Sequence, residues 1–77
     1  MIAGFVLIIT EAGMEHDVFM ALKGISEVSE VHPLFGVYDI ICKVQGEDSQ
    51  AIGETVVEKI RTIPGIDETK TLTSIVL

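Results

Sequence analysis

The residues best suited to recognising a small ligand form the segment Gly36-Val37-Tyr38-Asp39. Glycine permits positive φ and lets a ligand approach the backbone closely. An aspartate carboxylate can pair with a ligand ammonium group. The same segment is also typical of a plain hairpin, with a turn glycine and a solvated aspartate, so local spacing leaves both interpretations open.

A second polar group follows nearer the end of the chain, where Thr69, Thr71 and Thr73 alternate along an expected strand. Alternation in a strand places the three hydroxyls on one face. Threonine is common in strands, so the stripe is also typical of an exposed β surface. Beside an acidic loop, such hydroxyls would suit a small zwitterion.

Two histidines and the single cysteine complete the candidate chemistry. We interpret His16 as a solvated residue in the first turn of a helix. His32 is held extended by the following proline, and with Asp39 it forms the most plausible acid/base pair, which nothing local orders. Cys42 has no basic neighbour in sequence and is expected in the core.

Motifs that would indicate catalysis are absent from the sequence. It contains no Gly-rich phosphate loop, no GxSxG, no HExxH and no EF-hand spacing. One cysteine excludes an intrachain disulfide and a CxxC metal or redox site. We therefore expect neither an enzyme nor a bound metal or cofactor.

Length and charge restrict the protein further. Its 77 residues allow one domain over residues 1–77, and the 48% hydrophobic content excludes intrinsic disorder. The net charge of −7 disfavours direct binding to nucleic acid or to an anionic membrane. The apolar opening residues 1–10 are too few to span a bilayer, which takes roughly 20, and lack the basic start of a signal peptide. We expect a cytoplasmic protein.

Hydrophobic periodicity predicts the order β-α-β-β-α-β. The expected strands cover residues 2–10, 28–34, 38–45 and 66–77, with a tight connection at Phe35-Gly36. One helix is marked by apolar residues from Met14 to Ile25 and ended by Gly24, and a second runs from a capping turn at residues 46–49 to Pro64-Gly65.

A short internal repeat supports this order. Each expected helix is followed by the pattern Gly-Ile-x-Glu and a β-branched residue, starting at Gly24 and at Gly65. Two similar βαβ halves predict an α+β, ferredoxin-like βαββαβ fold, with two helices on one face of a four-stranded antiparallel sheet. The first strand is apolar on both faces. A domain this short buries only roughly 60% of its unfolded surface, so the open sheet face is predicted to bind a second copy.

At this point the sequence resembles the C-terminal effector-binding (RAM) domain of the Lrp/AsnC regulators. Residues 31–40 are similar to that family's G-x-[YF]-D hairpin. Ile63-Pro64-Gly65-Ile66 with Thr69-x-Thr71 is similar to its lPGV…t.T segment. The two motifs occur in the family's order, and the resemblance covers the whole chain.

The resemblance implies a sheet-to-sheet dimer of the dimeric α+β barrel type, and dimers that assemble into a higher oligomer, often an octamer. Small effectors, usually amino acids, would bind between dimers. Gly36 and its neighbours would offer backbone groups to the carboxylate, and Asp39 would pair with the ammonium. Thr69 and Thr71 would add polar contacts, and Tyr38 would lie near the ligand. The family's helix-turn-helix segment has no counterpart before the first strand, so we expect a stand-alone module acting through a partner that carries one.

Two alternatives remain from the sequence. An ACT-like regulatory domain of a metabolic enzyme has the same element order, and Glu11-Ala12-Gly13 could serve as its glycine-bearing loop. A small enzyme of the dimeric α+β barrel type would use His32 or Asp39.

Overall fold

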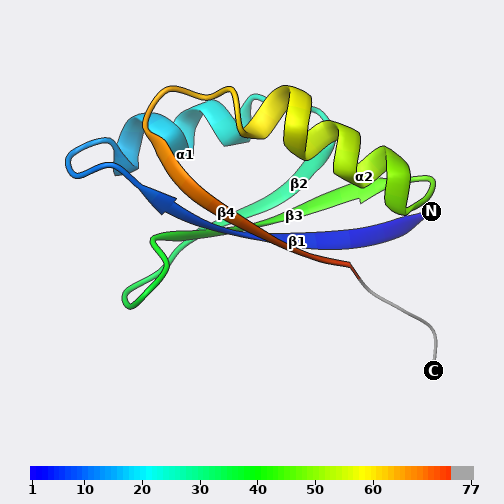
Figure 1. Cartoon of the computed structure of the whole chain (residues 1–77), viewed down its shortest axis with the longest axis horizontal. Helices are drawn as coiled ribbons and strands as arrows, with labels where there is room; N and C mark the ends of the chain where they lie inside the picture. Colours follow the sequence, from blue (N-terminus) through cyan, green and yellow to red (C-terminus); the bar gives the residue numbers. More distant parts are fainter. Residues whose placement is uncertain (74–77) are drawn as a thin grey trace.

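The computed structural model describes residues 1–73, and its secondary structure has the predicted β-α-β-β-α-β order (Figure 1). The elements are β1 (Ile2–Thr10), α1 (Glu15–Lys23), β2 (Val28–Pro33), β3 (Ile40–Gly46), α2 (Ser49–Thr55), a π-helical turn η1 (Val56–Ile60) and β4 (Ile66–Thr73). The predicted extension of the last strand to residue 77 lies outside the described residues.

The four strands form one antiparallel sheet in the order β2-β3-β1-β4. β1 is therefore a central strand, as its apolar composition predicts. Both helices cover the same face of the sheet, and the other face carries no helix (Figure 1). The ferredoxin-like fold predicted from the sequence is confirmed.

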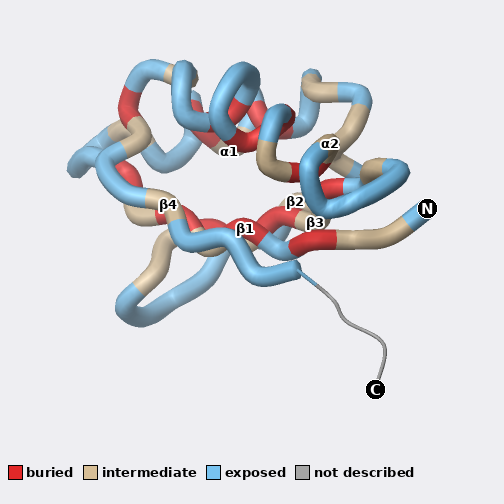
Figure 2. The backbone as a smooth tube through the Cα atoms, turned by 45° about the vertical axis from the view of Figure 1, so that its right-hand side comes forward, coloured by how far each residue is buried: buried red, intermediate tan, exposed pale blue. Residues whose placement is uncertain are grey.

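The core lies between the helices and the sheet (Figure 2). Alternate residues of β1 and β3 point into it, where they meet α1, α2 and η1. Its fully enclosed side chains are Val6, Ile8, Val18, Leu22, Ile40, Cys42, Val44, Ile52 and Ile60. The intervening residues of β1, including Phe5 and Leu7, point to the opposite face.

The open sheet face is apolar along β1 and is bordered by charges on the neighbouring strands. Phe5 pairs with Lys43 of β3 on one side and with Leu72 of β4 on the other. Phe5 remains 39% exposed and Leu72 48% exposed. This is the surface on which the sequence predicts self-association.

The second helix changes geometry part-way along its length. Asp48 caps its start, since its side chain accepts a 2.8 Å hydrogen bond from the Ala51 N–H, and this matches the predicted capping turn. From Val56 the turn widens, and the Arg61 N–H donates over 2.8 Å to the Val56 carbonyl five residues earlier. The sequence predicted an unbroken helix, because apolar spacing does not distinguish α from π turns.

Two glycines at helix ends behave differently. Gly24 caps α1 as predicted, but with φ −84° it stays in the right-handed region. Gly65 has φ +97°, and a Cβ there would lie 2.8 Å from the Met14 Cβ. Only glycine combines that backbone conformation with such close packing.

The connection between β2 and β3 is longer than predicted. The sequence favoured a tight turn at Phe35-Gly36 with a strand starting at Tyr38, and this was wrong, because β3 starts at Ile40. Residues 34–39 form a loop closed by the Leu34 N–H donating over 2.8 Å to the Asp39 carbonyl. Over residues 1–73, neither helix is long and apolar enough to cross a membrane.

Candidate functional site

Asp39 anchors the end of the 34–39 loop to the end of β1. Its N–H donates over 2.8 Å to the Ile8 carbonyl. Its Oδ2 accepts hydrogen bonds from Thr10, over 2.8 Å from the N–H and over 3.3 Å from the hydroxyl. Asp39 is therefore not a freely solvated residue, as the plain hairpin interpretation expects. Its carboxylate also has a structural role, because it binds Thr10. An ionised carboxylate has about four acceptor positions, so it retains capacity for a further donor.

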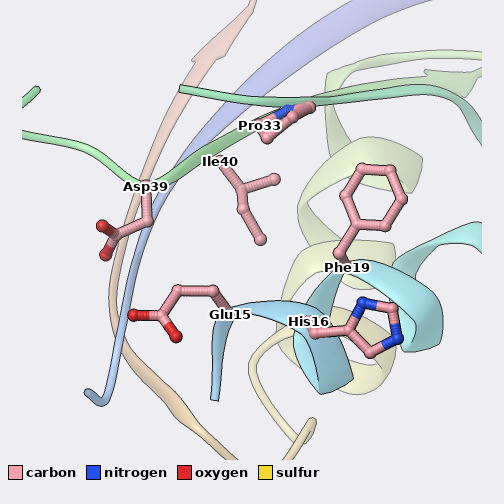
Figure 3. A pocket seen from close by; sticks show the side chains of 6 residues that line it. All are labelled: Glu15, His16, Phe19, Pro33, Asp39 and Ile40. Atoms are coloured by element: carbon pink, nitrogen blue, oxygen red, sulfur yellow. The ribbon is translucent and has the colours of Figure 1, made fainter. Parts of the chain in front are cut away.

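A cavity of about 290 Å³ opens beside Asp39, between the first turns of α1 and the ends of β2 and β3 (Figure 3). Its wall is made of apolar side chains and three titratable residues, namely Phe19, Pro33, Ile40, Glu15, His16 and Asp39. The carboxylates of Glu15 and Asp39 lie on one side, and His16 lies on the other beneath Phe19 (Figure 3). Such a lining suits a ligand with an apolar body and an amino group.

Sequence reasoning missed Glu15, His16 and Phe19 as cavity residues. They occupy the start of α1, far along the chain from the glycine-containing loop. The sequence did contain one indication of them, because Glu15 and His16 are polar residues at the start of an expected helix. Nothing in the local pattern indicates which strand end that helix reaches.

The remaining predicted site residues do not line this cavity. Gly36 is exposed with φ +158°, close to extended backbone, and a Cβ there would meet no atom within 4 Å. No other part of the same chain therefore approaches the Gly36 backbone closely. Tyr38 is half-buried beside it.

Thr69 and Thr71 lie on β4, which is separated from β3 by β1. Thr69 pairs with Ile8, which pairs in turn with Ile40 on β3. Two strand spacings amount to about 10 Å, so one copy of the chain does not bring these hydroxyls to Asp39. Thr73 pairs with Gly4, still further along β1.

His32 and Asp39 do not form an acid/base pair. His32 lies opposite Ile41, on the open sheet face, and its Nε2 is 3.1 Å from Glu30 Oε1. That hydrogen bond, helped by the positive charge of Lys43, lowers the pKa of the Glu30 carboxyl. His32 is therefore paired with Glu30, whereas the predicted acid/base pair requires Asp39.

Cys42 is a core residue, as predicted. It is 1% exposed, and burial raises the pKa of its thiol to about 11. The thiolate that would act as a nucleophile or metal ligand is therefore strongly disfavoured. Within residues 1–73, no three His, Cys, Asp or Glu side chains come together as a metal site.

The sequence of this chain is similar to the sequences of known proteins. The chain is 36% identical over 62 residues to the uncharacterised HTH-type transcriptional regulator PF0250 of Pyrococcus furiosus, covering 80% of this chain and 41% of that protein. It thus spans less than half the length of this curated relative.

Solved structures show the same fold. FFRP-DM1 superimposes with a TM-score of 0.91 at 36% identity, covering 97% of this chain and all of that one. AsnC of E. coli gives a TM-score of 0.90 at 28% identity, covering 99% of this chain and 52% of that one. Residues 3–77 match the family model described as the Lrp/AsnC ligand binding domain. The protein belongs to the Lrp/AsnC ligand-binding domain family.

Proposed function

We propose that this domain binds an amino acid or a closely related small metabolite and couples that binding to self-assembly. The observation that carries the proposal is the cavity of about 290 Å³ with the Asp39 carboxylate at its side, in a member of a ligand-binding family. An amino group would pair with Asp39, and an apolar side chain would lie against Ile40 and Phe19.

Among the side chains that line this cavity, only the His16 imidazole can donate a hydrogen bond to a ligand carboxylate, so the carboxylate needs further donors. In the proposed site they come from the backbone around Gly36 and Tyr38, and from Thr69 and Thr71 of a second copy. Because one copy holds the threonines about two strand spacings from β3, the complete site lies between copies.

The first step of assembly in this proposal is a dimer formed through the open sheet face. Phe5 and Leu72 are paired across β1 and β4 and are both partly exposed there. Packing two such faces together removes apolar area from water, which is the main favourable term in association. A ring of dimers, such as an octamer, would then form through other surfaces.

Control of transcription is assigned in this proposal to a partner in the cytoplasm. The 77 residues have a net charge of −7, which opposes contact with phosphates. A regulator with a helix-turn-helix segment, assembled with this domain, would make the DNA contacts. Gel shifts with the pure protein are expected to show no sequence-dependent binding at physiological salt.

Isothermal titration against the common amino acids tests the ligand. Asp39→Asn keeps an acceptor oxygen for Thr10 but removes the charge, so binding is expected to weaken at least tenfold while the fold persists. A Cβ added at Gly36 meets no atom of its own chain within 4 Å, so Gly36→Val is not expected to disturb the core. A loss of binding in that variant would place the ligand beside Gly36. Binding by none of the panel, or affinity unchanged in both variants, would contradict the proposal.

A further inference from the structure

Two carboxylates, those of Glu15 and Asp39, face the cavity from the same side (Figure 3). No lysine or arginine lines the cavity, and within residues 1–73 neither carboxylate forms an ion pair. Lys23 lies on the same helix as Glu15, but its Nζ lies over the Phe19 ring, 5.5 Å from the centroid, and Lys23 does not line the cavity. The cavity therefore carries negative charge that the described residues do not balance.

The Glu15 carboxylate has acceptor positions that its own chain does not use. Glu15 is exposed in the first turn of α1, and its Oε1 accepts one long hydrogen bond, 3.4 Å from the Gly13 N–H. A carboxylate has about four acceptor positions. Asp39 differs, because its Oδ2 binds Thr10 of β1 and so holds two elements together. A substitution at Glu15 therefore tests recognition of a ligand with little effect on the fold.

A neutral amino acid balances the charge of this cavity poorly. Its ammonium and carboxylate are attached to the same carbon, so an ammonium paired with Asp39 brings a carboxylate into the same negative field. A second cationic group on the ligand would offset this repulsion. The cavity also suits a methylene chain, because Ile40 lies between the two carboxylates and the Phe19 ring (Figure 3). Long cationic side chains bury their methylenes against such surfaces and keep the charged end in water.

We propose that the cavity selects an amino acid whose side chain ends in a cation, such as lysine, and that Glu15 makes this selection. The inference rests on the proposed function, because it starts from an amino group paired with Asp39. The methylenes of the ligand side chain lie against Ile40, and its terminal ammonium pairs with Glu15 at the exposed mouth of the cavity. The same two carboxylates disfavour an amino acid with an acidic side chain, because like charges repel.

Isothermal titration of the full chain with L-lysine and L-norleucine tests the selection. Norleucine has the same straight carbon chain without the terminal amino group. An exposed ion pair changes an affinity by up to about fivefold, so lysine should bind up to about fivefold more tightly. Glu15→Gln should reduce this ratio to about one by weakening lysine alone, and Glu15→Lys should make lysine the weaker ligand. Asp17→Asn is the control, because Asp17 shares the first turn of α1 but does not line the cavity, and it should keep the ratio.

The outcomes separate this inference from the proposed function. Equal affinities for lysine and norleucine, or binding of neither while another amino acid binds, would overturn the selection and leave the proposed function in place. A lysine preference that persists in folded Glu15→Gln and Glu15→Lys variants, or that Asp17→Asn also removes, would overturn the role of Glu15. Binding of no amino acid at all would contradict both proposals. Raising the salt concentration from about 0.1 M to about 1 M should reduce the preference for lysine, because screening weakens an exposed ion pair.

Discussion

Asp39 Oδ2 lies 2.8 Å from the backbone nitrogen of Thr10, joining residues 29 positions apart in the chain. The bond places the carboxylate at the junction of β1, the 34–39 loop and the cavity. A residue proposed to recognise ligand is thus also part of the fold, and substitutions must separate the two roles.

Asp39→Ala should lower the free energy of unfolding by about 1–3 kcal/mol, because the Thr10 donors lose a charged acceptor. Thermal unfolding should show a decrease of about 4–8 °C per kcal/mol for a domain of this size. The control is Asp67→Ala at an exposed position of β4, which should change stability by less than about 0.5 kcal/mol. Equal melting temperatures for the two variants would contradict a structural role of the bond.

Phe5→Glu and Val6→Glu should have opposite consequences although the residues are adjacent. Phe5 is 39% exposed on the open face, whereas Val6 is 0% exposed in the core. The first variant should remain folded and become monomeric, and the second should fail to fold because a charge cannot be buried unpaired. Circular dichroism and sizing distinguish these outcomes. A folded, dimeric Phe5→Glu variant would exclude the sheet-face interface.

Gly65→Ala should destabilise the domain by more than about 1 kcal/mol, since φ is +97° and the new Cβ would lie 2.8 Å from the Met14 Cβ. Gly53→Ala is the matched comparison, because a Cβ there meets nothing within 4 Å inside α2. Helix propensity should make that variant more stable by up to about 1 kcal/mol. Chemical denaturation measures both, and shifts of the same sign would refute this account.

Alkaline pH should weaken the fold through Cys42. The thiol pKa rises from 9.0 to about 11 in the folded protein, so above pH 9 the unfolded chain releases a proton that the folded chain keeps. Stability is therefore present below about pH 9 and is lost as the pH rises toward about 11. Cys42→Ala should remove this part of the pH dependence in denaturation experiments. Rapid alkylation of the native protein at pH 8 would contradict a buried, protonated thiol.

Elements with strong local patterns were predictable from the sequence. β1 runs from Ile2 to Thr10 as predicted, since a continuous apolar stretch ended by Glu11-Ala12-Gly13 admits few alternatives. The capping turn of α2 was also predicted, at residues 46–49, and Asp48 within that turn supplies the cap. In both cases the determining residues are adjacent in the chain.

Features set by distant contacts were not predictable. The loop before β3 depends on the pairing of Asp39 with Thr10, which no local pattern indicates. The candidate site was only partly visible for the same reason. Asp39 was a candidate from the sequence and lines the cavity, but the register that separates Thr69 from β3 and the packing that brings Phe19 to the cavity arise only in the assembled fold.

The central position of β1 has a consequence for synthesis on the ribosome. β1 is made first, yet its partner β4 begins only at Ile66, so one edge of the strand stays unpaired until the rest of the sheet has emerged. Pairing between such distant segments closes slowly, and an apolar strand with a free edge is a template for association with other chains. Nascent chains interrupted before Ile66 would therefore expose an aggregation-prone edge that the finished domain conceals.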